Sequence, residues 1–432
     1  MRFENSLAFA QQLDAQSPLK NYRSLFHYPQ QANGQPTIYF CGNSLGLQPK
    51  SVASYINQEL QDWATFGVEG HFEAQRPWFK YHHFLTQATA NLVGALPDEV
   101  VVMNALTVNL HLLLISFYRP TAQRYKIIIE GGAFPSDRYA VASHARLHGL
   151  DPQTVVVELF PRQKDYTLQT DDILKVIETI GHETALVLLG GVQYYTGQFF
   201  DLKTITEAAH NAGAIAGFDL AHAAGNVILN LHEWQVDFAA WCGYKYLNSG
   251  PGGSSGVFVH QKHGQNPDLL RLAGWWGNSE QTRFEMPHDF IPQQGATGWQ
   301  LSNAQVLNMA AHMASLEIFE QVGMAALRQK SEQLTGFAEF LIDSLNNKLQ
   351  KNIFNIITPR AVHQRGCQLS ILSENIDGRA VFEFLKQHGV ILDWRHPNVM
   401  RIAPVPLYNT FEEVFRFVTL LEDAYHNQMK DE

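Results

Sequence analysis

The chain has 432 residues, of which 45% are hydrophobic and 12% aromatic, and it carries a formal net charge of -10 at pH 7. This length exceeds what one hydrophobic core usually supports, and the acidic balance argues against binding to nucleic acids or anionic membrane surfaces. The three widely spaced cysteines do not indicate a disulfide framework, and no apolar run is long enough for a membrane helix, so we expect a cytoplasmic enzyme-sized protein of two unequal domains.

The N-terminal third begins with a short amphipathic helix, predicted from apolar residues at helical spacing within 3–13. A strand over 38–40 then leads into the turn GNSLG at 42–46, whose glycines permit unusual backbone angles. This turn either only connects the strand to the next helix or presents Ser44 to a ligand. Four apolar residues predict one face of the following helix: Val52, Ile56, Leu60 and Trp63. A lone histidine beyond it, His71, is by itself more typical of a structural role.

A helix start with phosphate-binding character follows an apolar strand that ends at Asn104. Leu106 and Thr107 begin this helix, which runs to Phe117. The free N–H groups and the dipole of a helix N-terminus both favour an anion, and the hydroxyl of Thr107 adds a donor. The alternative is that Asn104 or Thr107 simply caps the helix.

From residue 125 onward, strands and helices alternate. Strands are predicted at 125–130, 155–159, 185–189 and 214–219, and a capping box of Thr204 and Glu207 is expected to open the helix that precedes the last of them. This alternation indicates an α/β domain with a mostly parallel sheet flanked by helices. His144 and His148 lie four residues apart on a helix without an accompanying acidic motif, so we interpret them as part of an ordinary exposed face rather than a metal site.

The stretch from Asp219 to Gly253 offers an acid at the end of one apolar run and Lys245 at the end of the next. A pyridoxal phosphate enzyme needs a lysine for the aldehyde and an acid for the pyridinium nitrogen. The alternatives are a solvated lysine and an aspartate that serves a turn. In a parallel sheet, the carboxyl ends of the strands would gather five candidate residues at one edge: Phe134, Asp137, Asp219, His222 and Lys245.

In the C-terminal part, the regular alternation of strands and helices ends. An irregular loop is predicted over about 270–302, and Ser302 is expected to cap a helical region that extends to about 349. The remainder predicts a small α+β domain whose last helix begins with a capping box of Thr410 and Glu413. Arg401 stands in an apolar strand, where it forms either a buried internal salt bridge or a bidentate site for a substrate carboxylate. We divide the chain into an N-terminal segment 1–50 near the small domain, a large domain 51–310 and a small domain 311–432.

The chain closely resembles the kynureninase family, which are pyridoxal phosphate enzymes of the aspartate aminotransferase fold (fold type I). The resemblance covers nearly the whole chain from 39 to 409, in eight motifs: YFCGNSLGLQPK, MNALTVNLHLLLISF, AFPSDRYA, GVQYYTGQ, GFDLAHAAGNV, WCGYKYLNSGPGG, GWWGN and RIAPVPLYN.

The resemblance implies a role for individual residues. Lys245 would form the Schiff base with pyridoxal 5'-phosphate, Asp219 would pair with the pyridinium nitrogen, and Tyr244 beside Lys245 would assist in proton transfer. The implied cofactor-binding residues are Leu106, Thr107, Phe134, Pro135, Ser136, Asp137, Asp219, His222, Tyr244, Lys245, Trp275 and Asn303. Trp275 and Asn303 match positions that approach the cofactor across a homodimer interface. The implied substrate-binding residues are Ser44, His71, Asn303 and Arg401.

The implied reaction is hydrolysis of L-kynurenine, with 3-hydroxy-L-kynurenine as a second substrate, in tryptophan catabolism and NAD biosynthesis. One departure is Gly190, which stands where many relatives have a hydroxyl residue near the cofactor. Two alternatives stay open: another enzyme of the same fold, such as a cysteine desulfurase or an aminotransferase, and a non-catalytic binding protein. A desulfurase needs a reactive cysteine on a mobile loop, whereas Cys41, Cys242 and Cys367 stand in apolar, turn or strand contexts.

Overall fold

The computed structural model describes residues 2–163 and 165–431. Its largest sheet has seven strands in the order β2-β8-β7-β6-β5-β3-β4. In chain order the strands are β2 (Val100–Met103), β3 (Lys126–Glu130), β4 (Val156–Leu159), β5 (Thr184–Gly190), β6 (Ile215–Asp219), β7 (Phe238–Trp241) and β8 (Ser255–Val259). Strands β3 to β7 are mutually parallel, and β8 runs antiparallel to both of its neighbours. The predicted α/β fold with a mostly parallel sheet is therefore confirmed.

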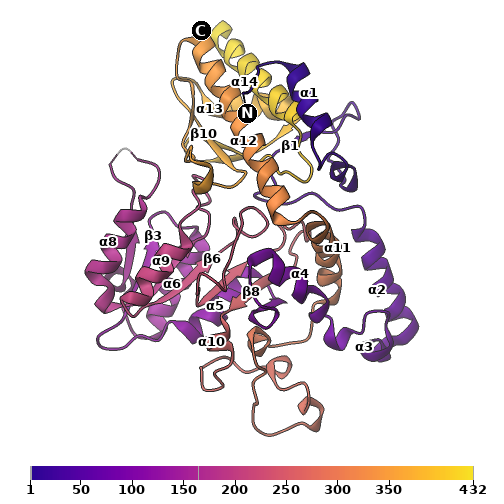
Figure 1. Ribbon diagram of the computed structural model, residues 1–432, viewed down its shortest axis with the longest axis vertical. Helices are drawn as coiled ribbons and strands as arrows, with labels where there is room; N and C mark the ends of the chain where they lie inside the picture. Colours follow the sequence, from indigo (N-terminus) through magenta and orange to yellow (C-terminus); the bar gives the residue numbers. More distant parts are fainter. Residues whose placement is uncertain (1, 164, 432) are drawn as a thin grey trace.

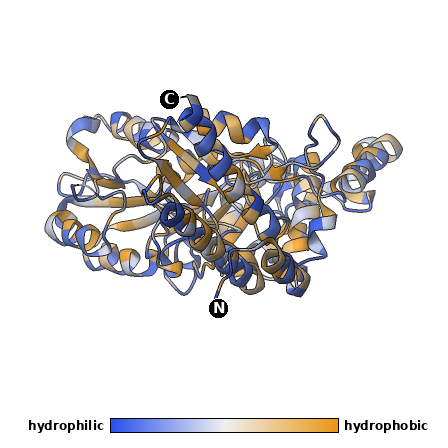
Figure 2. Cartoon of the chain, turned by 90° about the horizontal axis from the view of Figure 1, so that it is seen from above, coloured by the Kyte–Doolittle hydropathy of each residue, from blue (hydrophilic) through white to orange (hydrophobic). Residues whose placement is uncertain are grey.

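Helices cover both faces of this sheet. Successive residues of a strand point to opposite faces, so each strand contributes side chains to two separate cores. Ile128 of β3 and Val187 of β5 pack in one core with α8 (Thr170–Ile180) and α9 (Leu202–Asn211). Their neighbours Ile127 and Leu186 pack in a second core with α5 (Leu106–Phe117) and α6 (Pro135–Leu147). Figure 2 shows the hydrophobic colour concentrated along the strands and the hydrophilic colour on outward helix faces. Both faces are buried, as a central parallel sheet requires.

A smaller unit lies above the large sheet in Figure 1. It contains the sheet β12-β13-β10-β9 and the two-stranded pair β1-β11. Its strands are β1 (Ile38–Tyr39), β9 (Phe354–Ile356), β10 (Leu369–Ser373), β11 (Val390–Ile391), β12 (Asp393–Arg395) and β13 (Val399–Ile402). Its helices are α1 (Leu7–Gln16), α12 (Met324–Leu349), α13 (Gly378–Gln387) and α14 (Phe411–Asp431), and one hydrophobic core joins them. The N-terminal residues 7–16 and 38–39 thus pack with the C-terminal part of the chain.

The remaining helices flank the large sheet or connect it to the smaller unit. They are α2 (Val52–Phe66), α3 (Gly70–Glu73), α4 (His83–Val93), α7 (Pro152–Val155), α10 (Gln261–Gly264) and α11 (Val306–Val322). The irregular region predicted near 270–302 contains only three short 3-10 turns among its described residues: η6 (Trp275–Gly277), η7 (Arg283–Glu285) and η8 (Ala296–Trp299). None of the described helices is long and apolar enough to cross a membrane.

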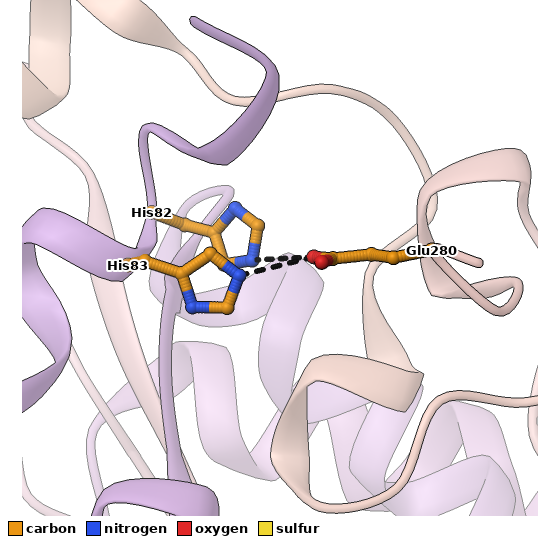
Figure 3. Close-up of side chains that lie close together, drawn as sticks. All are labelled: His82, His83 and Glu280. Carbon is orange, nitrogen blue, oxygen red and sulfur yellow. Dashed lines mark hydrogen bonds and ion pairs between the residues drawn. The ribbon is translucent and has the colours of Figure 1, made fainter. Parts of the chain in front are cut away.

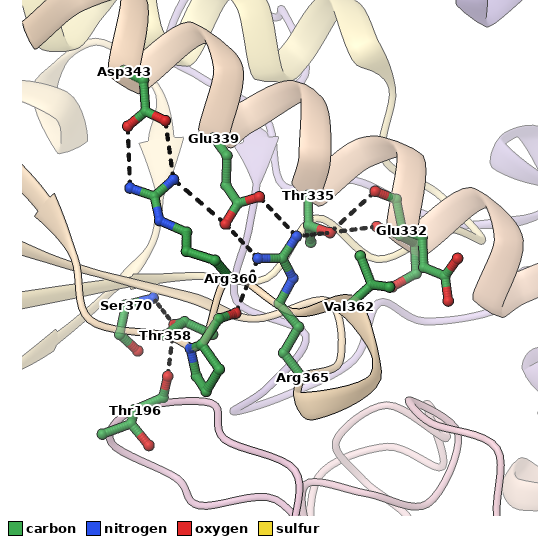
Figure 4. Close-up of polar contacts among 12 residues, drawn as sticks. Thr196, Glu332, Thr335, Glu339, Asp343, Thr358, Arg360, Val362, Arg365 and Ser370 are labelled. Atoms are coloured by element: carbon green, nitrogen blue, oxygen red, sulfur yellow. Dashed lines mark hydrogen bonds and ion pairs between the residues drawn. The ribbon is translucent and has the colours of Figure 1, made fainter. Parts of the chain in front are cut away.

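Polar contacts tie the segment between α12 and β10 to both parts of the molecule (Figure 4). Arg365 is 1% exposed and forms a two-pronged ion pair with Glu339 of α12. Thr358 Oγ1 donates a 2.6 Å hydrogen bond to the carbonyl of Thr196, which lies in the loop after β5, and accepts one from the Ser370 backbone N–H at 2.8 Å. This loop of the large sheet, which also carries Tyr194, is thereby held against the smaller unit.

Three details of the sequence interpretation are wrong. Helix α9 starts at Leu202 because Asp201, not Thr204, caps it, with the Asp201 side chain accepting from the Thr204 N–H at 3.1 Å. Helix α11 starts at Val306 rather than at Ser302, and Gly323 separates it from α12. His144 is buried and pairs with His111 at 3.0 Å, so it does not belong to an exposed face.

The capping box of Thr410 and Glu413 is confirmed, with both reciprocal hydrogen bonds at 3.1 Å.

Candidate active site

A cavity of about 240 Å³ opens at the carboxyl ends of β3, β5 and β6. It brings together nine of the predicted site residues: Leu106, Thr107, Phe134, Ser136, Asp137, Asp219, His222, Tyr244 and Lys245. Pro135 stands between two of them as the first residue of α6. The same cavity is lined by six residues that the sequence analysis did not place near the cofactor: Ala105, Val108, Glu130, Val192, Tyr194 and Ala221. The position matches the expectation for an open α/β sheet, where ligands bind beyond the carboxyl ends of strands.

One end of the cavity is formed by the open N-terminus of α5. Residues 105–108 line it, no side chain caps the helix, and no acidic residue lies in its first turn. Asn104 instead bonds to Asn109 at 3.0 Å, so the alternative that Asn104 or Thr107 caps this helix does not apply. The first N–H groups of a helix have no partner within it, and together with the dipole they favour an anion such as a phosphate.

Lys245 lies in the loop after β7, and its Nζ is 3.0 Å from Nε2 of His222. Burial, and then the nearby Lys245, lower the pKa of His222 well below its usual range, so this imidazole is neutral and accepts the hydrogen bond. The other ring nitrogen of His222, Nδ1, is buried without a partner in the described chain. Lys245 Nζ also stands 5.8 Å from the centroid of the Phe134 ring.

Asp219 and Asp137 form a buried acid pair on the cavity wall. Burial raises the pKa of both, and Asp219 raises the pKa of Asp137 further, so Asp137 holds the proton and donates to Asp219. Asp219 Oδ1 also accepts from the Ala221 N–H at 2.7 Å. An acid placed here, close to Lys245 but without a direct ion pair among the described residues, fits a cationic nitrogen on a ligand ring.

These features fit pyridoxal phosphate. The free helix start would take the phosphate, Asp219 the ring nitrogen, Lys245 the aldehyde, and the unpartnered Nδ1 of His222 a further polar atom. Phe134, 41% exposed beside Lys245, offers an aromatic face for the ring.

The side chains of Tyr244 and the three cysteines are all protonated at neutral pH. Burial raises the pKa of Tyr244, so its hydroxyl stays protonated at neutral pH. Burial also raises the pKa of Cys41 to about 11 and that of Cys367 to about 12, and it raises the pKa of Cys242 as well. A thiol of this kind is not a ready nucleophile, which disfavours the cysteine desulfurase alternative.

Arg401 lies next to the cavity on β13 and is fully buried. It forms an ion pair with Asp393, donates a 2.6 Å hydrogen bond to the carbonyl of Tyr194, and places Nη2 3.4 Å from the hydroxyl of Ser44. The buried internal salt bridge that the sequence left open is therefore present. Asp393 itself was not foreseen, because it becomes a partner of Arg401 only through the pairing of β12 with β13.

The other predicted residues lie outside the cavity within a single chain. His71 and Asn303 line a second cavity of about 280 Å³ together with Glu59, Trp63, Trp78, Ala304, Val306 and Leu307. Trp275 belongs to η6, is 46% exposed, and donates from Nε1 to the Arg283 carbonyl at 3.4 Å. The structure thus brings most of the predicted cofactor site together and keeps His71, Asn303 and Trp275 apart from it.

A further cluster joins His82, His83 and Glu280 (Figure 3). Nε2 of His83 is 3.0 Å and Nε2 of His82 is 3.9 Å from Glu280 Oε1, a spacing that a metal ion could bridge. However, Arg283 and Lys80 lie nearby: burial, followed by His83, Arg283 and Lys80, lowers the pKa of His82 to about 3. Two neighbouring cations oppose the binding of a third, so we assign no metal to this cluster.

The chain matches known proteins over nearly its whole length. It is 55% identical over 420 residues to a kynureninase of Myxococcus xanthus and 52% identical over 422 residues to one of Flavobacterium psychrophilum, covering 97% or more of each chain. Residues 327–421 match the family model described as the kynureninase C-terminal domain.

Solved structures of similar fold include the apo cysteine desulfurase of Thermococcus onnurineus, with a TM-score of 0.72, 18% identity and 99% of both chains covered. Another is a C-DES variant with glycine covalently linked to its PLP cofactor, with a TM-score of 0.73, 18% identity, and 90% of this chain and 96% of that chain covered. At such identities these two likenesses establish only the fold. The identity to the curated relatives is far higher and spans both parts of the molecule, and the chain therefore belongs to the kynureninase family.

Proposed function

We propose that this protein hydrolyses L-kynurenine to anthranilate and L-alanine with pyridoxal 5'-phosphate as its cofactor. The observation that carries the proposal is that Lys245, Asp219 and the open start of α5 line one cavity. The chain that holds this cavity is 55% identical to a kynureninase. Bound pyridoxal phosphate supplies an aldehyde for the substrate amine and a ring that accepts electrons from the substrate carbon.

The residues that would hold the cofactor line the cavity. Leu106 and Thr107 offer free N–H groups and a hydroxyl to the phosphate, and Asp219 offers its carboxylate to the ring nitrogen. Phe134 would cover one face of the ring, with Ser136 and Asp137 at the start of α6 completing the polar wall. Pro135 fixes the backbone at that helix start.

Lys245 is the group best placed to move the proton of the substrate α-carbon. Its Nζ lies 3.0 Å from Nε2 of the neutral His222, and both residues line the same cavity as Asp219. Tyr244 precedes Lys245 and lines the same cavity with a protonated hydroxyl, so it is suited to donate a proton as the carbon–carbon bond breaks. Water must add to the side-chain ketone before that cleavage.

Arg401 and Ser44 are proposed to receive the α-carboxylate of the substrate. Arg401 Nε is buried without a partner in the described chain, which leaves donor capacity beyond the ion pair with Asp393. The carbonyl contact to Tyr194 directs the guanidinium toward a residue of the cavity wall. A substrate carboxylate would then share Arg401 with Asp393 rather than displace it.

Absorption spectroscopy and one assay test this proposal. The purified protein, supplied with pyridoxal phosphate, is expected to be yellow and to convert L-kynurenine to fluorescent anthranilate. A protein that stays colourless contradicts the cofactor assignment and favours a non-catalytic binding protein. A yellow protein that leaves kynurenine intact but transaminates an amino acid or releases sulfide from cysteine contradicts the substrate assignment alone.

The second cavity supports a proposal about the aromatic end of the substrate. His71 and Asn303 line it beside Trp63 and Trp78, a combination of polar groups and rings that suits an aromatic ring with a hydroxyl. We assign to these two residues the recognition of 3-hydroxy-L-kynurenine as a second substrate.

A homodimer would bring the second cavity to the first. The predicted apolar face of α2 is only partly buried in the single chain: Val52 is buried and Ile56 packs against the core, whereas Trp63 is 62% exposed and Val68 beyond the helix is 74% exposed. Further exposed apolar residues on this side are Leu60, Phe66, Phe72 and Leu307. A surface of this kind on a chain of this size marks an interface, and we propose a second copy of the chain as its partner, with Trp275 and Asn303 reaching the partner's cofactor site.

We further propose the division into a segment 1–50, a large domain 51–310 and a small domain 311–432, which is supported by the separate hydrophobic core of the smaller unit. Three free cysteines support a cytoplasmic location, and the substrate supports a place in tryptophan catabolism and NAD biosynthesis.

A further inference from the structure

Glu130 is a buried acid of the cavity to which the proposed reaction assigns no role. It is the last residue of β3, is 4% exposed and lines the cavity. The neighbouring strand β5 ends at Gly190, which stands in register with Asp219 at the end of β6. Two carboxyl groups therefore flank Gly190 on adjacent strand ends.

Gly190 accommodates the Glu130 carboxyl group in two ways. Its N–H lies 3.0 Å from Glu130 Oε2 and 3.2 Å from Oε1, and among the described residues no lysine or arginine forms an ion pair with this carboxylate. A Cβ atom built on Gly190 would stand 2.9 Å from Glu130 Oε1, closer than real side chains pack. Gly190 is not in the left-handed backbone region, so a larger residue here would be opposed by the position of the Glu130 carboxyl group and not by its backbone angle.

Glu130 and the acid pair influence each other's protonation. Burial raises the pKa of Glu130 to about 7, Asp219 raises it too, and the N–H of Gly190 opposes both. Glu130 is in turn one of the charges that raise the pKa of Asp137. The cavity adds Lys245 and the neutral His222 to this set, so three carboxyl groups face a single ammonium group. Because Asp137 is protonated and the raised pKa leaves Glu130 only partly ionised at neutral pH, a cation bound in the cavity would favour the ionised form of Glu130 beside Asp219.

We propose that Glu130 is a positioning residue of the cofactor pocket, whose carboxylate adds a second negative charge to that of Asp219 in stabilising the protonated ring of pyridoxal phosphate, and that Gly190 leaves the room for it. The inference rests on the proposed cofactor site. It also accounts for the missing hydroxyl at position 190, because the space of that side chain is taken by the Glu130 carboxyl group.

The first test replaces the charge and keeps the shape. Glu130→Gln is expected to weaken the equilibrium affinity of the apoenzyme for pyridoxal phosphate about tenfold and to lower the pH midpoint of the bound cofactor's absorption by about one unit, because the protonated form loses a nearby negative charge. The matched control is Glu158→Gln on the adjacent strand β4, which removes the same charge outside the cavity and should leave both quantities unchanged. The melting temperature of each apoenzyme shows whether the variants fold.

The second test examines the space at Gly190 by a double-mutant cycle. Gly190→Ala should weaken cofactor affinity in the wild-type background and have little effect in the Glu130→Ala background, where the clashing oxygen is gone. Equal losses in both backgrounds would show that the two residues act independently and would overturn the steric half of the proposal.

The outcomes separate this inference from the proposed function. If wild type binds pyridoxal phosphate and Glu130→Gln matches Glu158→Gln in affinity and in pH midpoint, Glu130 has no such role although the cofactor site stands. If Glu130→Gln loses affinity with an unshifted midpoint, its role is steric and the electrostatic half is overturned. If wild type binds no cofactor, the proposed function itself fails.

Discussion

At the scale of single residues, the chemistry concentrates in groups whose protonation is set by burial. His222 is kept neutral next to Lys245, Tyr244 is kept protonated, and Asp137 holds a proton beside Asp219. Each of these states follows from the cost of charging a group away from water. These states support the proposed roles of Lys245 as the base, Tyr244 as a proton donor and Asp219 as the anion that a cationic ring requires.

Replacing Tyr244 tests the proposed proton donor. Tyr244→Phe removes only the hydroxyl from the cavity wall, so turnover of L-kynurenine is expected to fall by about 10²- to 10⁴-fold, the usual worth of a general acid. The visible absorption spectrum and the affinity for pyridoxal phosphate should change little. Steady-state kinetics and a cofactor titration measure the two effects, and an unchanged turnover removes Tyr244 from the mechanism.

Replacing His71 tests the proposed recognition of the substrate ring. His71→Ala is expected to lower kcat/KM for 3-hydroxy-L-kynurenine more than for L-kynurenine, because only the former has a hydroxyl for the imidazole to bond. The comparison uses both substrates with the same enzyme preparation. Equal losses for both would mean that His71 does not read the hydroxyl.

At the scale of elements, strand ends and helix starts place the reacting groups. The carboxyl ends of β3, β5 and β6 supply Glu130, Gly190 and Asp219, and the starts of α5 and α6 supply the free N–H groups and Phe134. Helix α11 packs against the loop that carries Lys245. Its His312 is buried, and a Cβ atom on Gly243, two residues before Lys245, would lie 3.2 Å from the His312 ring.

His312 is expected to make the fold acid-sensitive. Burial lowers its pKa from 6.5 to about 4, so between these values the unfolded chain binds a proton that the folded chain does not. This group therefore does not reduce the free energy of unfolding above pH 6.5, but it reduces that free energy as the pH falls toward 4, by about 2 kcal/mol between pH 7 and pH 5.

Thermal melting at pH 7 and pH 5 measures this contribution. His312→Leu should show a smaller drop in Tm over that interval than wild type, whereas His363→Leu, at an exposed position, should match wild type. Parallel pH profiles for wild type and His312→Leu would contradict the assignment.

At the scale of the whole molecule, the single chain has two cavities that we propose are halves of one site. The cofactor cavity has Lys245 and the acids, and the second cavity has His71 and Asn303. The exposed apolar side of α2 adjoins the second cavity, since Trp63 belongs to both. A two-fold dimer that covers this surface is self-complementary, so each second cavity would serve the partner's cofactor.

Hybrid dimers test that arrangement. Lys245→Ala and Asn303→Ala are each expected to be nearly inactive as homodimers, but their co-expressed mixture should recover about a quarter of wild-type activity, because random pairing yields one complete site in half of the dimers. Light scattering establishes the dimeric mass. A mixture of Lys245→Ala with Asp219→Asn is the control and should recover nothing, since both residues line one cavity of one chain. Recovery in neither mixture, with hybrids demonstrably formed, would place Asn303 in its own chain's site.

The sequence by itself determined the features that depend on local pattern. Strand–helix alternation predicted the parallel sheet, and the acid and the lysine after apolar runs predicted Asp219 and Lys245 at its edge, because the period of hydrophobic residues and the end of a run are visible over a few residues. The start of α5 and the capping box of α14 were visible for the same reason.

Only the tertiary structure decided contacts between distant segments. Glu130 meets Gly190 across 60 residues, Arg401 meets Ser44 across 357, and the predicted apolar face of α2 is buried at Val52 but exposed at Trp63. Nothing in a local pattern states which face of a helix finds a partner or which strand ends become neighbours. Glu130 carried the same signal as Asp219, an acid closing an apolar strand, but its function follows only from the glycine that faces it.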